Sequence, residues 1–210
     1  QGENNMLVSI CGSSGSGKSV LLKHLENMGF NVVQRKTSRS ILADWNVTLE
    51  QVNIDPILAM KFQDEILKRK VDDDLCSSLQ SKSPITFTER NYADLFVYAV
   101  SSVLGWNNDY SEWLNNYYQQ CMHNQKMYDK IIFIESGAFP AVNDGVRPSN
   151  THFNTMINLT MQHYLEKMSP NFLSIQMPSI RDRLHCILDE VFDQNDYPEY
   201  NNYVDKIKEF

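Results

Sequence analysis

The sequence predicts an α/β protein of three layers, a five-stranded, mostly parallel sheet with helices on both faces. Three observations support this fold class. Short apolar runs alternate along the chain with longer segments in which apolar residues recur at helical spacing. The runs are apolar at consecutive positions, as expected of strands that are buried on both sides. The 210 residues are enough for one sizeable hydrophobic core, so a single domain is expected.

The five predicted strands are the short apolar runs. They cover residues 6–11, 31–34, 84–88, 130–134 and 172–176. Strands joined by helical crossovers run parallel, and their carboxyl ends then meet at one edge of the sheet. Ligands bind at that edge in open α/β sheets, so we expect the functional site there.

The predicted helices fill the intervals between the strands. They cover residues 19–28, 57–79, a segment after the third strand with Ala93 and Phe96 on its core face, 112–124, 153–168 and 179–192. Gly29 suits the C-terminal cap of the first helix, and Ser179 suits the N-terminal cap of the last. The polar residues 193–202 predict a tail that is mobile or packed only at its end. We assign residues 6–210 to one domain and expect residues 1–5 to be a tag remnant or a flexible N-terminus.

Composition restricts the partners and the location of the protein. The net charge of −7 argues against sequence-independent binding of nucleic acid over a large basic surface. The basic residues within 35–39 are still compatible with a local contact to nucleic acid. The four cysteines form no CxxC pair, which is typical of reduced thiols in a cytoplasmic protein without a zinc site. No apolar run approaches the roughly 18 residues that span a bilayer, so no membrane partner is expected.

A glycine-rich motif follows the first predicted strand. Gly12-Ser13-Ser14-Gly15-Ser16-Gly17-Lys18-Ser19 matches the pattern GxxxxGK[ST] at every fixed position, and a predicted helix follows. In this P-loop motif the glycines turn backbone N–H groups toward phosphates, and the helix N-terminus adds partial positive charge. We predict that residues 12–20, Val20 included, bind ATP, with Lys18 on the β- and γ-phosphates and Ser19 on Mg²⁺. The alternative is a flexible Gly/Ser turn.

An acid–base pair at the end of the third predicted strand is the candidate for the acceptor side. Glu89 can accept a proton or hold Mg²⁺, and Arg90 can neutralise phosphate charge. The alternative is a glutamate that only complements a helix dipole. Tyr92, Trp45 and Trp106 are each expected in the core, with stacking on a base as the alternative. That alternative makes Tyr92, which follows the acid–base pair, a candidate residue for contact with the acceptor.

Three further segments carry candidate binding residues. Lys36, Thr37 and Arg39 follow the second strand and offer donors to the sugar or phosphate of an acceptor. Asp144 and Arg147 lie in a segment that is expected to close over ATP, with Arg147 stabilising the transferred group. The alternative for that segment is a surface turn. Arg181 and Arg183 are predicted to lie in solvent, with a contact to adenine or phosphate as the alternative.

The order of these motifs resembles the nicotinamide riboside kinase domain of bacterial NAD-salvage proteins and related AAA-like nucleotide-kinase domains. The motifs that carry the resemblance are residues 12–19, Arg39, Glu89-Arg90 with Asp94 and Tyr98, and Pro140 with Asp144-Gly145-Val146-Arg147. The resemblance covers most of residues 6–190 and implies a P-loop NTPase three-layer sandwich. Those relatives commonly carry a glutamate before the arginine that follows strand two, where this chain has Lys36-Thr37-Ser38. The implied acceptor is therefore a nucleoside or nucleotide of open identity.

The sequence predicts an ATP-dependent kinase that transfers the γ-phosphoryl group to such an acceptor, with Lys18, Glu89, Arg90 and Arg147 as catalytic residues. Two alternatives stay open at this point. The first is a kinase that acts on a hydroxylated modified base in DNA. The second is a nucleotide-dependent switch or ATPase with little transferase activity, for which Glu135 at the end of the fourth strand is the candidate Mg²⁺ partner. The oligomeric state is not predicted.

Overall fold

The computed structural model describes residues 5–34, 36–80, 83–107, 109–135, 151–192 and 197–208. Five strands form one sheet in the order β2-β3-β1-β4-β5, and all four strand pairs are parallel. The strands are β1 (Met6–Cys11), β2 (Asn31–Val33), β3 (Ile85–Glu89), β4 (Lys130–Ile134) and β5 (Leu173–Ile175). The predicted fold class is confirmed, and the predicted strands agree with the observed ones to within one residue at each end.

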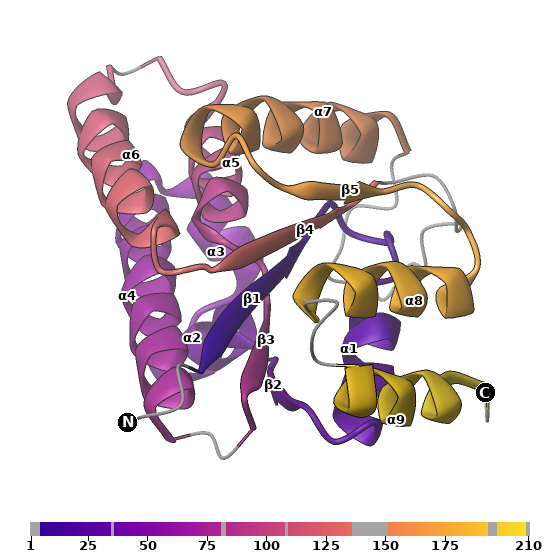
Figure 1. The fold of residues 1–210 in the computed structure, drawn as a ribbon. Helices are drawn as coiled ribbons and strands as arrows, with labels where there is room; N and C mark the ends of the chain where they lie inside the picture. The colour runs from indigo at the N-terminus through magenta and orange to yellow at the C-terminus, as the bar shows by residue number, and fades with distance from the viewer. Residues whose placement is uncertain are drawn as a thin grey trace.

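Helices cover both faces of the sheet (Figure 1). One face carries α1 (Lys18–Asn27), α8 (Ile180–Val191) and α9 (Tyr197–Lys208). The other face carries α4 (Pro56–Gln80), α5 (Tyr92–Val103), α6 (Ser111–Gln125) and α7 (Thr151–Met168). No helix among the described residues is both long and apolar enough to cross a bilayer.

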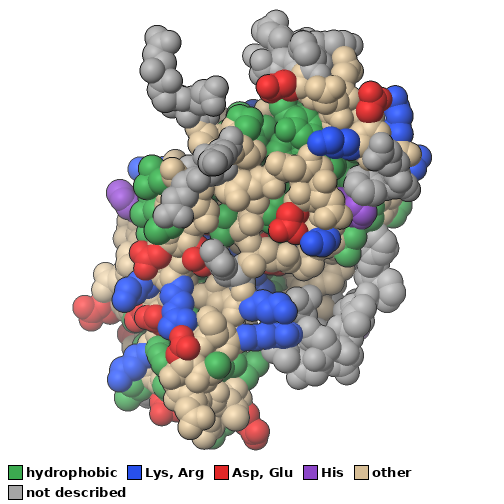
Figure 2. Space-filling view, turned by 90° about the horizontal axis from the view of Figure 1, so that it is seen from below, with side chains coloured by type: hydrophobic (Ala, Val, Ile, Leu, Met, Phe, Trp, Pro, Cys, Tyr) green, Lys and Arg blue, Asp and Glu red, His purple; other side chains and the backbone are tan. Residues whose placement is uncertain are grey.

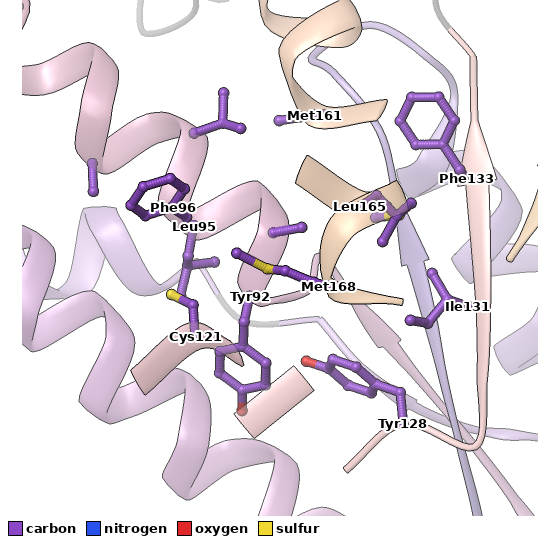
Figure 3. Packing of buried hydrophobic residues seen from close by; sticks show 14 of the residues in the cluster. Tyr92, Leu95, Phe96, Cys121, Tyr128, Ile131, Phe133, Met161, Leu165 and Met168 are labelled. Atoms are coloured by element: carbon purple, nitrogen blue, oxygen red, sulfur yellow. The ribbon is translucent and has the colours of Figure 1, made fainter. Parts of the chain in front are cut away.

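Alternate residues of the strands β1 and β4 supply the two cores. In β4, Ile131 and Phe133 face the α5 side, whereas Ile132 and Ile134 face the α1 side. This alternation follows from the two-residue period of a strand and explains why the strands are apolar at consecutive positions. Figure 3 shows the α5-side core, where helix residues such as Leu165 pack over β4.

A small third cluster lies beside the main cores. The helices α2 (Thr37–Trp45) and α3 (Leu49–Ile54) pack on the first half of α4 through Ile41, Val52 and Phe62. Neither α2 nor α3 was predicted from the sequence. The clearest local signal is the capping box of α3, in which Thr48 and Gln51 exchange side-chain and backbone hydrogen bonds.

The C-terminal segment differs from the predicted tail, which was to be mobile or packed only at its end, because residues 197–208 form the helix α9. Ile207 is fully buried in the α1-side core. Lys206 Nζ donates a 2.7 Å hydrogen bond to the carbonyl of Met28, just past the end of α1. The helix therefore packs along much of its length against the main body of the protein.

Candidate functional site

The predicted P-loop lies between β1 and α1, at the carboxyl edge of the sheet. Gly12 has φ +138°, and a Cβ at this position would lie 2.3 Å from the carbonyl oxygen of Ile134 at the end of β4. Gly15 and Gly17 also have positive φ, 79° and 92°. Glycine is required at Gly12 for space as well as conformation, because the loop passes directly against the end of β4.

Lys18 is the first residue of α1, and its ammonium group is folded back into the loop. Lys18 Nζ donates hydrogen bonds to the carbonyls of Gly12 and Ser13, both at 2.7 Å, and to Ser16 Oγ at 3.3 Å. Burial lowers the pKa of Lys18 to about 8, and the nearby charge of Arg90 adds to this effect, while Glu89 opposes it. The loop thus holds a desolvated cation where phosphates would be bound.

Glu89 and Arg90 lie next to this loop, because β3 is the neighbour of β1 in the sheet. Glu89 is in register with Ile10, and it lies two residues after Phe87, on the same face of β3, the α1 side. The Arg90 amide donates to the carbonyl of Ile10 at 2.9 Å. The α5 helix begins at Tyr92 with Asn91 as its cap, so Glu89 belongs to the strand and not to the first turn of the helix.

The side chain of Arg90 turns toward α5. Its φ of 67° is unusual for a residue other than glycine, and such strain is typical of functional positions. The guanidinium lies over the ring of Tyr98, 4.9 Å from the ring centroid. Arg90 is close enough to Lys18 and Asp94 for its charge to affect the pKa of both. The structure therefore brings the P-loop lysine and the acid–base pair into one charged cluster.

Asp94 also belongs to this cluster. The sequence indicates it only through the resemblance to nucleotide-kinase domains. It is 1% exposed, and burial raises its pKa to about 6 against the opposing charges of Lys18 and Arg90. A hydrogen bond from the Gly12 backbone also favours the charged form. Its Oδ2 atom accepts no hydrogen bond from any residue that the structure describes. Asp94 therefore adds a buried carboxylate directly behind the P-loop.

Other predicted site residues lie elsewhere. Tyr92 is fully buried, donates through its hydroxyl to Asp74 at 3.2 Å and stacks on Tyr128 at 5.5 Å between ring centroids (Figure 3). Its predicted contact with an acceptor is therefore wrong, because no ring face is open to a base. The prediction that it belongs to the core is confirmed. Asp144 and Arg147 lie outside the described residues, so their role stays a prediction.

Lys36, Thr37 and Arg39 stand at the start of α2 and not in a loop. Lys36 and Thr37, but not Arg39, are among the residues around a pocket of about 460 Å³ between α2 and α4. The other residues around this pocket are Ser40, Arg69, Asp72 and Asp73. Arg69 is held there by Asp44 and Glu65, both at 2.8 Å. The pocket is lined by both basic and acidic side chains, so its charge alone does not favour the binding of a phosphate.

Arg183 contradicts the prediction that it lies in solvent. It is fully buried in the first turn of α8 and donates to the carbonyl of Ser16 in the P-loop at 2.6 Å. Arg181, two residues earlier, is exposed as predicted. The sequence offers no sign of this difference beyond the helical spacing, which places Arg183 on the same side of α8 as the buried Ile187.

The residues around the loop fit a nucleotide with Mg²⁺. Ser13 Oγ and Asp94 Oδ2 are both buried and have no hydrogen-bond partner among the described residues. Within the described part of the chain, no group of three or more His, Cys, Asp or Glu residues could hold a metal. Mg²⁺ in kinases does not need such a cage, because it binds one or two side-chain oxygens together with phosphates and water. Ser19, exposed at the start of α1, and Glu89 are the side chains predicted to bind it.

The family of the chain follows from comparison with known proteins. A family model described as an AAA domain matches residues 7–183. The chain belongs to this family. A search of curated proteins found no match.

Solved structures show which fold this AAA-domain protein shares. The NadR protein in complex with NR has a TM-score of 0.65 and 14% sequence identity over 99% of the chain. The match covers 52% of NadR, so the chain spans about half the length of that protein. Deoxyadenosine kinase from M. mycoides with bound dATP has a TM-score of 0.64 and 13% identity, with 89% of this chain and 99% of the kinase covered. The AAA-domain protein thus has the P-loop nucleoside-kinase fold.

Proposed function

We propose that the protein is an ATP-dependent kinase that transfers the γ-phosphoryl group to a nucleoside- or nucleotide-type acceptor. The observation that carries the proposal is the position of Glu89 and Arg90, at the end of β3 beside Lys18 of the P-loop. A nucleotide held by residues 12–19 has its terminal phosphate near this strand end, where an acceptor can approach in line. Solved structures of the similar fold, NadR with AMP-PNP and deoxyadenosine kinase with dATP, support the choice of ligand class.

Each residue has a distinct part in the proposed reaction. The acceptor oxygen forms a bond to the γ-phosphorus, the bond to the β–γ bridging oxygen breaks, and ADP leaves. Lys18 and Arg90 neutralise charge on the phosphates, and Glu89 orients the acceptor hydroxyl and receives its proton. Ser19 and Glu89 would hold Mg²⁺ together with the phosphates, and the ion would supply further neutralisation of charge. Arg147, which lies outside the described residues, is proposed to join this set and to neutralise charge on the transferred group.

Two observations bear on the alternatives. Glu135, the candidate Mg²⁺ partner of a switch, accepts hydrogen bonds from Ser174 Oγ at 2.5 Å and Gln176 Nε2 at 2.8 Å, which direct it toward β5. Basic and acidic side chains are interspersed on the face shown in Figure 2 and do not form one broad basic surface for DNA. The kinase of free nucleosides or nucleotides is therefore the better supported function.

Incubation with γ-labelled ATP and a panel of acceptors tests the proposal. The panel contains the common nucleosides, nicotinamide riboside, nucleoside monophosphates and an oligonucleotide with a hydroxymethylated base. Label should pass to a nucleoside or a monophosphate and should stay with ATP in the Lys18→Ala variant. Transfer to the oligonucleotide alone would favour the DNA-base kinase. Release of labelled phosphate without any acceptor product would favour the ATPase or switch.

A further inference from the structure

Arg183 joins two segments that are far apart in the sequence. Its Nη1 atom donates a 2.6 Å hydrogen bond to the carbonyl of Ser16, which is 167 positions away. Its Nε atom donates a second 2.6 Å bond to the carbonyl of Met177, between β5 and α8. A fully buried guanidinium is costly to desolvate, so its position needs a reason beyond filling space.

Ser16 is the residue of the P-loop that is held from two sides. Its carbonyl accepts from Arg183, and its hydroxyl accepts from Lys18 Nζ at 3.3 Å. A trans peptide unit is planar, with its C=O and N–H groups pointing in opposite directions. When Arg183 fixes the Ser16 carbonyl, it therefore also fixes the direction of the Gly17 N–H, on the opposite side of the same peptide.

We propose that Arg183 is a positioning residue for the phosphate loop, which directs the Gly17 N–H toward a bound phosphate by holding the Ser16 carbonyl. Through Met177 it also anchors the loop to the β5–α8 connection. The inference rests on the proposed binding of a nucleotide by residues 12–19. It goes beyond the sequence prediction for Arg183, which was solvent or direct contact with the ligand.

The planar guanidinium is suited to this task because it presents several donors in a fixed geometry. A lysine has a single ammonium group on a flexible stem and cannot hold both carbonyls in the same way. Hydrogen bonds from charged donors contribute about 1.5–3 kcal/mol, which corresponds to roughly a 10- to 150-fold change in an equilibrium constant. We therefore expect Arg183→Gln to weaken ADP binding at least about 10-fold and Arg183→Lys to have a smaller effect in the same direction.

The experiment compares wild type, Arg183→Gln and Arg183→Lys with Arg181→Gln as the matched control. Arg181 lies on the same helix and carries the same charge, but it is exposed. Calorimetry measures ADP affinity well below the melting temperature of each variant. Hydrogen exchange measures protection of the amides of residues 13–18 without nucleotide. Both Arg183 variants should lose affinity and loop protection, whereas Arg181→Gln should match wild type. Arg183→Lys keeps the charge, so its ADP affinity and loop protection provide the test if Arg183→Gln does not fold.

The outcomes separate this inference from the proposed function. A folded Arg183 variant with wild-type ADP affinity and wild-type loop protection would show that the residue only packs α8. If wild type binds ADP and phosphorylates no acceptor, the kinase proposal fails, whereas the role of Arg183 is still decided by the ADP affinity and loop protection of its variants. If wild type binds no ADP, the role of Arg183 fails together with nucleotide binding.

Discussion

Lys70 and Asp74 form a 2.7 Å ion pair one turn apart on α4, and both side chains are buried. Thr88, the residue before Glu89, joins them, because its Oγ1 lies 2.6 Å from Lys70 Nζ and 2.7 Å from Asp74 Oδ1. The hydroxyl of Tyr128 donates to the other carboxylate oxygen at 2.7 Å. This network fixes α4 against the end of β3, directly before the acid–base pair of the candidate site.

We expect Asp74→Asn to lower the free energy of unfolding by about 3–5 kcal/mol, because it leaves the charge of Lys70 buried without its partner. Urea denaturation followed by circular dichroism measures the change. The exposed pair Lys23–Glu26 at 2.9 Å provides the control, and Glu26→Gln should cost less than about 1 kcal/mol. A loss for Asp74→Asn as small as that of the control would show that the network does not stabilise the fold.

The strands, the P-loop and the neighbouring end of β3 could be predicted because each has a local signal. Consecutive apolar residues indicate a buried strand, and the fixed spacing of Gly12, Gly17 and Lys18 indicates a phosphate loop. The carboxyl-edge rule for parallel sheets then places Glu89 near that loop without any knowledge of the contacts. The register of Ile10 with Glu89 agrees with this expectation.

The remaining features depend on contacts between distant residues, which a single sequence does not show. The sequence around Arg183 does not distinguish it from an exposed arginine on a helix. Only the tertiary fold brings its side chain to Ser16. Tyr92 follows the acid–base pair in sequence, yet helix α5 turns its side chain toward Asp74 on α4. The helices α2 and α3 are short and share a small core with α4, so their apolar spacing is too brief to be recognised.

Gly12→Ala should destabilise the protein through a direct clash. The added Cβ would lie 2.3 Å from the Ile134 carbonyl, and the backbone has φ +138°. Gly105→Ala is the matched control, because Gly105 also has positive φ, +96°, but no heavy atom lies within 4 Å of its Cβ position. Both variants share backbone strain of roughly 1–3 kcal/mol, so thermal unfolding should show a greater loss for Gly12→Ala. Equal losses of stability in the two variants would show that the end of β4 moves enough to accommodate the added Cβ of residue 12.

Asp94 should make stability fall as pH rises. Its pKa is raised from 3.8 to about 6, so the folded state retains a proton that the unfolded state has lost. The groups that face it are Lys18, Arg90 and Lys70, whose charges oppose the shift, and the thiol of Cys11. A shift of about two pKa units costs about 3 kcal/mol above pH 6, and this cost disappears toward pH 4.

Asp94→Asn removes this ionisation. The variant should be more stable than wild type above pH 6, and the difference should shrink as pH approaches 4. Urea denaturation between pH 4 and pH 8 measures the two curves, with the exposed Asp205→Asn as the control for a surface carboxylate. A constant difference across this range, or a wild type that is more stable at pH 8, would contradict the raised pKa. Greater stability together with weaker phosphoryl transfer would show that Asp94 serves the site at the expense of the fold.

Glu89 is the residue on which the kinase and switch alternatives differ most. A kinase must orient an acceptor oxygen toward the γ-phosphorus, and Glu89 ends the strand that lies beside the P-loop. Glu89→Gln keeps the size and hydrogen bonding of the side chain and removes its charge. ADP should still bind through residues 12–19, whereas transfer to the acceptor should fall roughly 100-fold or more, the scale for loss of a positioned base.

The matched control for Glu89→Gln is Glu135→Gln at the end of β4, because Glu135 is bonded to Ser174 and Gln176. Transfer should be lost in the first variant and kept in the second, and the reverse result would favour a switch that holds Mg²⁺ through Glu135. A titration with Mg²⁺ separates the two parts proposed for Glu89. If the metal dependence of the residual activity is unchanged, the carboxylate acts on the acceptor; if more Mg²⁺ restores activity, its main part is to hold the metal. Full activity of Glu89→Gln at every Mg²⁺ concentration would remove Glu89 from the site.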